Sequence, residues 1–216
     1  MQIHSIQNYN KYLQPSPTFG KWYRTVYQGE TPLTQKILHK NNTWLYREES
    51  FWRLLCYHLA KRFNNIEHIN VYNYACSNGM ETYTFLMELI SNYKEDFVKK
   101  FLPIKAMDYD PIAIAEARTG ILEIENIEKD KINEYTRGQF NRFFEKIPNT
   151  KSSYRVQREL TDNVIFSVAD IREDYKKIEP INSLVLARNF WPYLGKQMPL
   201  NKMAKKLYEQ MDKIHF

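Results

Sequence analysis

The stretch VYNYACSNGME, residues 71–81, decides the fold that this sequence predicts. Its first four residues, VYNY, are of the kinds favoured in strands, and the small and polar residues ACSNG follow directly. Behind them Phe85, Leu86, Leu89 and Ile90 recur at helical spacing. A strand, a turn of small residues and a helix are typical of the ligand site of a doubly wound α/β sheet, because small residues let a ligand approach the backbone.

The next unit of the chain strengthens this interpretation. The apolar run Ile104–Asp108 reads as a second strand and ends in an acidic residue. A carboxylate at this place in nucleoside-binding α/β folds accepts hydrogen bonds from ribose hydroxyls, so Asp108 is a candidate ligand-binding residue. Asp110 followed by Pro111 predicts a helix N-cap and first helical residue, and Gly120 predicts the end of the helix over 112–119. The turn after residue 74 contains no G-x-G-x-x-G pattern, which argues against a dinucleotide site.

Length and composition indicate one soluble domain with a small appendage. The chain has 216 residues, of which 43% are hydrophobic, and this is enough apolar surface for a packed core. Its net charge is +6, but Lys and Arg are spread along the chain, which favours a solvated basic surface over a nucleic-acid groove. Cys56 and Cys76 have no metal or disulfide spacing, and the chain begins without a signal-peptide pattern. We therefore expect a cytoplasmic protein without a metal site or a membrane-inserted segment.

The remaining segments predict further elements of the same fold. Residues 1–40 form a short helical region in this interpretation, with Phe19, Trp22, Tyr23, Val26 and Tyr27 at helical spacing. Residues 140–166 alternate around a polar loop, which predicts a small antiparallel β insertion that includes the strand beginning at Val164. Apolar faces predict two more helices, one with Phe51, Leu55, Leu59 and Phe63 and one over 201–216, and Ser183–Ala187 reads as a buried strand.

In this order, the motifs resemble the CheR-type methyltransferases, which use S-adenosylmethionine to methylate glutamate side chains of chemotaxis receptors. The resemblance covers residues 41–194 and is carried by five stretches: NNTWLYRE, YACSNGMETYT, AMDYDPIAIAEARTGI, FNRFFEK with YRVQREL and VIFSVADI, and VLARNFWPYL. It implies a Rossmann-like class I methyltransferase sheet over 41–216, with the β insertion at about 140–166 and the helical region of 1–40 before it. It also implies S-adenosylmethionine as cofactor, S-adenosylhomocysteine as product and a chemoreceptor-like cytoplasmic domain as partner.

The resemblance assigns roles to individual residues of this chain. Arg47 and Tyr193 border the point of methyl transfer and are the expected catalytic residues. Asp108 matches the ribose-binding acid, and Glu81 matches an acidic cofactor-binding position. The full set of expected cofactor-binding residues is Asn41, Thr43, Arg47, Ala75, Glu81, Asp108, Asp170, Ile171, Asn189 and Phe190.

Several positions depart from the family pattern. The family usually has Gly where Ala75 stands, an acid where Met80 stands and Asn where Asp170 stands. Its members also continue beyond the last matched motif into a closing pair of strands, so the chain reads as a C-terminally shortened member. An open sheet edge would follow.

Three functions remain open at this point. The favoured one is methyl transfer to protein glutamates, and it needs no general base because a glutamate is already ionised near neutral pH. The alternative is a catalytically idle, CheR-like remnant that acts as a protein-interaction module, motivated by the altered positions and the short C-terminus. Methyl transfer to nucleic acid is the weakest alternative, since it rests on the net charge alone.

Overall fold

The structure is a computed structural model that describes residues 25–26, 39–40, 43–188 and 200–211. The chain divides into two compact units, Met1–Asn42 and Thr43–Phe216. In the described part of the first unit, β1 (Thr25–Val26) pairs antiparallel with β2 (His39–Lys40). The helix expected around residues 19–27 is thus wrong at Val26, because the β-branched neighbours at 25 and 26 favour extended backbone. The other residues of that expected helical face lie outside the described residues.

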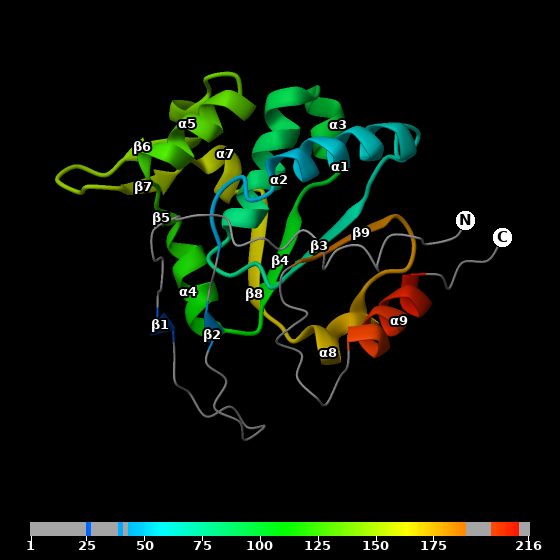
Figure 1. The fold of residues 1–216 in the computed structure, drawn as a ribbon. Coiled ribbons are helices and arrows are strands. Elements are labelled where there is room, and N and C mark those ends of the chain that lie inside the picture. Colours follow the sequence, from blue (N-terminus) through cyan, green and yellow to red (C-terminus); the bar gives the residue numbers. More distant parts are fainter. Residues whose placement is uncertain (1–24, 27–38, 41–42, 189–199, 212–216) are drawn as a thin grey trace, which may run out of the picture. The chain divides into compact units, whose positions relative to one another are not determined.

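The second unit is built on a four-stranded sheet with the order β8-β4-β3-β9. Its strands are β3 (Asn70–Tyr74), β4 (Ile104–Asp108), β8 (Val164–Val168) and β9 (Ser183–Ala187), and every neighbouring pair is parallel. Val71 lies opposite both Ile104 and Leu184, which sets the register across the middle of the sheet. Figure 1 shows this sheet in the middle of the second unit, between its helices. The doubly wound, Rossmann-like fold predicted from the sequence is confirmed.

One face of the sheet carries the larger hydrophobic cluster. Because side chains alternate along a strand, Val71, Ile104 and Leu186 share this face. Helices α1 (Glu49–Arg62), α2 (Met80–Asn92) and α4 (Pro111–Thr119) contribute to the same cluster. Its centre lies where Trp52 of α1 packs near Phe85 of α2, with ring centroids 6.2 Å apart. Of the apolar face predicted for α1, Leu59 is buried, whereas Phe51, Leu55 and Phe63 are only partly buried against the cluster. Cys56 is buried as expected, and Trp52 is the further buried residue of this face.

The opposite face carries a smaller cluster. Tyr72, Tyr74 and Met107 project there from β3 and β4. They are covered by α8 (Ile171–Asp174), the 3₁₀ turn η2 (Tyr175–Lys177) and α9 (Leu200–Met211), which lie together in Figure 1. Met203 and Leu207 are buried on α9, as its predicted amphipathic pattern requires. Residues 212–216 of the predicted C-terminal helix lie outside the described part of the chain.

The small antiparallel sheet is present, but its membership differs from the prediction. It has the order β5-β7-β6, with β5 (Ile121–Glu123), β6 (Phe144–Lys146) and β7 (Ser153–Val156), and β6 and β7 project as a hairpin in Figure 1. The strand at Val164 belongs instead to the parallel sheet, as β8 beside β4. Ile165 and Val168 of β8 are both more than half exposed, because β8 is an edge strand of the parallel sheet and is not covered on both faces.

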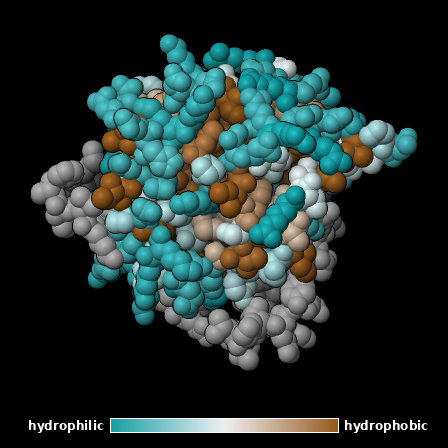
Figure 2. Space-filling model, turned by 180° about the vertical axis from the view of Figure 1, so that it is seen from behind, coloured by the Kyte–Doolittle hydropathy of each residue, from teal (hydrophilic) through white to brown (hydrophobic). Residues whose placement is uncertain are grey.

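The remaining helices of the second unit are short connections around these sheets: α3 (Glu95–Lys99), α5 (Asn126–Tyr135), α6 (Phe140–Phe143) and α7 (Arg158–Thr161). On the face seen in Figure 2, hydrophobic side chains form separate patches between hydrophilic ones. Across the described ranges, no helix has the length and apolar character that crossing a membrane requires.

Helix α4 begins as the sequence predicts, and its cap gives the first testable expectation. The Asp110 carboxylate accepts the Ile112 N–H at 2.9 Å, Pro111 occupies the first turn and Gly120 ends the helix in the left-handed region. Replacing Asp110 with alanine removes this capping bond, so we expect the free energy of unfolding to fall by about 1 kcal/mol. Urea denaturation followed by circular dichroism measures this loss. Asp110→Asn retains a capping oxygen and serves as the matched control, and an equal loss in both variants would contradict the capping role.

Candidate functional site

The carboxyl ends of the parallel strands meet at one edge of the sheet, and the loops there are bonded to one another. Cys76 N–H, just after β3, donates to the Met107 carbonyl at 3.0 Å, and Ser77 N–H donates to Asp108 Oδ2 at 2.7 Å. Ala169 N–H, just after β8, donates to the Asp108 carbonyl at 2.9 Å. The loops after β3, β4 and β8 thus form one connected rim, where open α/β sheets bind ligands.

The turn between β3 and α2 has an unusual backbone. Ala75, Ser77 and Gly79 have φ angles of 58°, 51° and 89°, which lie in the left-handed region. A non-glycine residue there costs about 1–2 kcal/mol, and such strain is found mainly at functional sites. The left-handed backbone at Ala75 explains why the family pattern usually has glycine at this position, because glycine adopts a positive φ without steric cost. The Ser77 hydroxyl is buried without a hydrogen-bond partner among the described residues, so the turn holds a polar atom suited to a ligand.

Asp108 is the acceptor around which this rim is ordered. Its Oδ2 accepts the Ser77 N–H, and its Oδ1 accepts the Asp110 N–H at 2.9 Å. These two bonds fix the orientation of the carboxylate at the end of β4. The side chain is half-buried at the end of β4, as a ribose-binding carboxylate requires.

Asp170 and Ile171, also expected to bind the cofactor, have structural contacts of their own. The Asp170 carboxylate caps α8 by accepting the Arg172 N–H at 2.9 Å, and it pairs with the Arg172 guanidinium. The hydrogen bond between the Arg172 guanidinium and the Asp170 carboxylate raises the pKa of Arg172. The Ile171 side chain is buried in the smaller cluster. The Asp170 N–H donates to Asp174 Oδ2 at 3.1 Å, and its carbonyl accepts the Asp174 N–H at 2.8 Å, so Asp170 is engaged through both its side chain and its backbone.

Residues 43–48 precede α1 and carry Thr43 and Arg47, two further expected site residues. Tyr46 and Glu48 have left-handed backbone, with φ angles of 54° and 56°. Tyr46 N–H donates to Thr84 Oγ1 on α2 at 3.0 Å, and Trp52 Nε1 donates to the Arg47 carbonyl at 3.0 Å. These contacts hold the segment against the first turns of α1 and α2.

The side chains of this segment differ in their exposure. The Tyr46 side chain is buried, and burial raises the pKa of its hydroxyl. Arg47 and Thr43 are half-buried, and the Arg47 guanidinium lies 4.5 Å from the centroid of the Trp44 ring. Stacking on an aromatic ring orients a guanidinium.

Arg188, which was not among the expected site residues, lies between these elements. Arg188 directly follows β9, and its guanidinium contacts Glu48 at 2.7 Å and Glu81 at 3.4 Å. It also lies 4.2 Å from the ring centroid of Phe51. Its position directly after the predicted strand 183–187, inside the quoted stretch VLARNFWPYL, was the only available sequence signal. That strand is mostly half-buried, with only Leu186 buried, because it lies at an edge of the described sheet. Through Arg188, the structure connects Glu81 with the segment that carries Arg47.

Two other candidate features of this rim are a reactive cysteine and a metal site. Cys76 lies in the turn, but burial raises the pKa of its thiol well above the usual range, so it remains a protonated core residue. No group of three or more His, Cys, Asp or Glu side chains suited to a metal ion occurs in the ranges that the structure describes. Asn41, Asn189, Phe190 and Tyr193 of the expected site lie outside the described residues.

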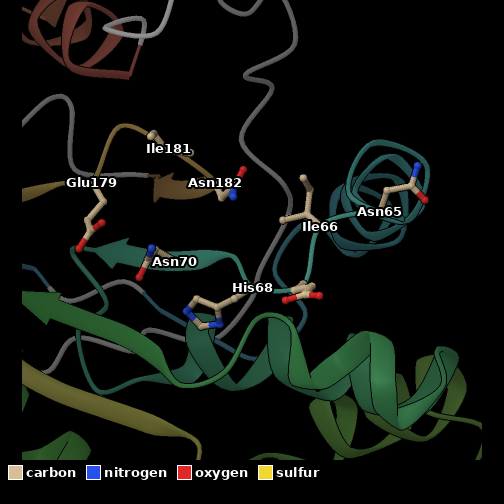
Figure 3. Close-up of a pocket in the computed structure, with 8 residues that line it drawn as sticks. Asn65, Ile66, His68, Asn70, Glu179, Ile181 and Asn182 are labelled. Carbon is tan, nitrogen blue, oxygen red and sulfur yellow. The ribbon is translucent and has the colours of Figure 1, made fainter.

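A hollow of about 530 Å³ lies at the other edge of the sheet. It is lined by side chains around the amino ends of β3 and β9, among them His68, Asn70, Glu179 and Asn182 (Figure 3). Asn70 N–H donates to the Asn182 carbonyl at 2.8 Å there. This hollow is separated by the length of the strands from the rim that contains Asp108.

Comparison with known families agrees with the geometry of the rim. The family model described as CheR methyltransferase, SAM binding domain, matches residues 41–214, which is most of the chain. No curated protein matches the sequence. The residues at the rim fit the nucleoside part of S-adenosylmethionine. The turn is made of small residues, the buried Ser77 hydroxyl has no partner among the described residues, and the Asp108 carboxylate is held in a fixed orientation. The chain therefore belongs to the CheR methyltransferase family, and its cofactor is S-adenosylmethionine.

Proposed function

We propose that the protein transfers a methyl group from S-adenosylmethionine to glutamate carboxylates of a protein substrate, such as the cytoplasmic domain of a chemoreceptor. The sulfonium of the cofactor supplies a reactive methyl group for an in-line displacement by a carboxylate oxygen. The substrate glutamate is ionised near neutral pH and needs no general base. The task of the chain is therefore to hold cofactor and carboxylate in line and to stabilise their charges.

The proposed cofactor contacts come from the rim. In this proposal Asp108 accepts hydrogen bonds from the ribose hydroxyls, and the backbone of the turn at Ala75 approaches the amino-acid part of the cofactor. Glu81, in the first turn of α2, offers its carboxylate to the cofactor ammonium. Residues 170–171 contact the adenine side. Asn41, Thr43, Asn189 and Phe190 complete the proposed contacts from the two segments that flank the site.

The observation that carries the substrate assignment is the strained segment before α1. Two left-handed residues, Tyr46 and Glu48, bracket Arg47, and bonds to Thr84 and Trp52 hold the segment against α2 and α1. Such backbone strain is retained where a precise side-chain position is needed. A planar guanidinium suits a carboxylate, so Arg47 is the proposed partner of the substrate glutamate, with Tyr193 bordering the transferred methyl group.

The small antiparallel sheet is the proposed docking surface for the protein substrate. It carries exposed charged residues on β6 and β7, including Glu145, Lys146 and Arg155. A hairpin that projects from the domain offers an accessible strand edge for pairing with an extended peptide.

The test is methyl transfer to a chemoreceptor cytoplasmic fragment, with the same fragment carrying Gln at its methylation-site glutamates as control. We expect a methyl mass increase that appears only on the first fragment and that alkali removes, because a carboxyl methyl ester is base-labile. We expect Arg47→Met to abolish transfer with a smaller effect on S-adenosylhomocysteine affinity. Transfer that survives this substitution would contradict the proposed role of Arg47.

A second outcome separates the idle-remnant alternative from an active enzyme. Stoichiometric binding of S-adenosylhomocysteine, with no base-labile methylation of the receptor fragment, would contradict glutamate methylation and favour an interaction module. A methyl group that appears on added RNA or DNA would favour the nucleic-acid alternative.

A further inference from the structure

We propose that Glu88 is a proton-dependent positioning residue: together with Tyr46 it holds the segment 43–48 in place, and it does so best while its carboxyl group is neutral. The pair lies in the interior of the domain, about two helical turns beyond the start of α2. Only its effect on methyl transfer rests on the proposed function, through Arg47, which directly follows Tyr46.

Glu88 is buried at a place where a charged side chain is rare. It lies on α2 between Met87 and Leu89 and is only 1% exposed. Its Oε1 accepts a hydrogen bond from Asn92 Nδ2 at 3.0 Å, whereas Oε2 is buried and has no hydrogen-bond partner within the described ranges. A buried carboxylate without a paired cation loses its hydration without compensation, so burial favours the protonated form and raises the pKa of Glu88.

The Tyr46 hydroxyl is the second polar group in this part of the core. Tyr46 is fully buried, and its hydroxyl oxygen also has no hydrogen-bond partner among the residues that the structure describes. Burial raises the pKa of Tyr46, and the neighbouring Glu88 raises it further, so the two groups lie close together. Each is the available hydrogen-bond partner of the other. A neutral carboxyl group can donate its proton to Tyr46 Oη, whereas an ionised one can accept the hydroxyl proton but keeps an uncompensated charge in the core.

The other titratable groups around Glu88 do not neutralise its carboxylate. They are Arg53 and Cys56 on α1, Tyr93 directly after α2, Tyr135 at the end of α5 and Arg137 just beyond it. Burial raises the pKa of Glu88 more than the two arginines lower it, and neither arginine donates a hydrogen bond to Oε2. The Arg53 side chain is exposed, with its guanidinium 4.9 Å from the ring centroid of Tyr135. The charge of Glu88 is therefore set by its own proton.

Tyr46 links this pair to the segment that carries Arg47. Its backbone has a left-handed φ of 54°, a conformation that tertiary contacts must retain in a residue other than glycine. Those contacts are the N–H bond to Thr84 Oγ1 at 3.0 Å, the stacking on Tyr135 at a ring-centroid distance of 5.2 Å, and the hydroxyl beside Glu88. Ionisation of Glu88 places a charge against this buried ring. We therefore expect the segment to open more often as the pH rises through the pKa of Glu88.

Hydrogen exchange of the Tyr46 amide, which donates to Thr84, measures this opening by NMR after correction for the intrinsic exchange rate. The closed domain holds the Glu88 proton more tightly than the opened one, so opening becomes easier as the pH rises. From about pH 5 to about pH 9, we expect protection to fall about tenfold for each unit by which burial raises the pKa. Glu88→Gln has a neutral amide in place of the carboxyl group, so its protection should remain constant. Glu95→Gln removes an exposed carboxylate bonded to Lys99 at 2.6 Å, and its protection should fall as in wild type.

Titration of the Glu88 carboxyl carbon by NMR tests the wild-type protein without any substitution. We expect a midpoint above the ordinary value of about 4.3, and a midpoint at or below it overturns the inference. Protection of the Tyr46 amide that is independent of pH in wild type, or that falls equally in Glu88→Gln, also overturns it.

The rate of methyl transfer separates this inference from the proposed function. Above the Glu88 midpoint we expect the wild-type rate to fall in parallel with the protection of Tyr46, while Glu88→Gln retains its rate and both proteins bind S-adenosylhomocysteine with equal affinity. A rate that stays constant while protection falls overturns the positioning role. If protection falls as expected but no methyl transfer to the receptor fragment occurs at any pH, the proposed function is wrong and the proton-dependent contact stands.

Discussion

Replacing Asp108 with alanine is expected to lower the affinity for S-adenosylhomocysteine by about two orders of magnitude or more. In the proposed contact the carboxylate accepts bonds from two ribose hydroxyls, and a hydrogen bond to a charged group contributes about 1.5–3 kcal/mol. The substitution also removes the acceptor of the Ser77 N–H at 2.7 Å, so the turn after β3 loses an anchor. Calorimetric titration of the folded variant measures the combined effect.

Asp110→Ala is the matched control for this experiment. It removes a neighbouring carboxylate whose Oδ1 serves as the cap of α4, so it should lower stability while S-adenosylhomocysteine still binds. Equal affinities for wild type and a folded Asp108→Ala variant would contradict the proposed ribose contact. Measuring the unfolding of both variants in urea separates lost contacts from lost structure.

Replacing Gly79 with alanine is expected to lower the free energy of unfolding by about 2–5 kcal/mol. The backbone there has a φ of +89°, which costs a non-glycine residue about 1–2 kcal/mol. A Cβ would also lie 2.8 Å from Cζ of Phe166, and overpacking of this kind costs about 1–3 kcal/mol. The Phe166 ring packs edge-on against Tyr83, so its displacement spreads into the start of α2. Denaturant unfolding measures the loss, and we expect weaker cofactor binding with it.

Gly138→Ala isolates the backbone part of this effect. Gly138 has a similar left-handed φ of +79°, but a Cβ there would meet no atom within 4 Å. We expect it to cost only the backbone strain of about 1–2 kcal/mol and to leave cofactor affinity unchanged. If the two variants lose equal stability, the contact with Phe166 contributes nothing and the expectation for Gly79 is wrong.

Much of the fold could be predicted because its signals are local. The strand and turn at 71–79, the capped helix after Asp110 and the acidic end of β4 each depend on neighbouring residues, and all are confirmed. Strand partners depend on distant residues. The three residues of β5 pair with β7 some thirty positions later, and β8 pairs with β4, which lies about sixty positions earlier, rather than with the neighbouring insertion.

The candidate site shows the same division between local and distant signals. Asp108 could be found because a strand ends there. The contact between Arg188 and Glu48 could not be predicted, because the two residues lie 140 positions apart in the sequence. The left-handed backbone at Tyr46 and Glu48 involves residues other than glycine, so tertiary contacts such as the bond to Thr84 determine it.

The hydrophobic clusters on the two faces of the sheet differ in size, and this difference determines which part of the native domain unfolds locally first. The smaller cluster contains far fewer of the described residues, so α8, η2 and α9 form the part that can detach while the larger cluster stays intact. The loop that leads into α8 begins at Ala169, whose N–H is bonded to the Asp108 carbonyl. A cofactor that contacts both Asp108 and residues 170–171 binds only the closed arrangement, and each bound molecule reduces the opening frequency by mass action. With these proposed contacts, we expect amide hydrogen exchange in α8 to slow as cofactor concentration rises, although α8 lies on the face of the sheet opposite the larger core.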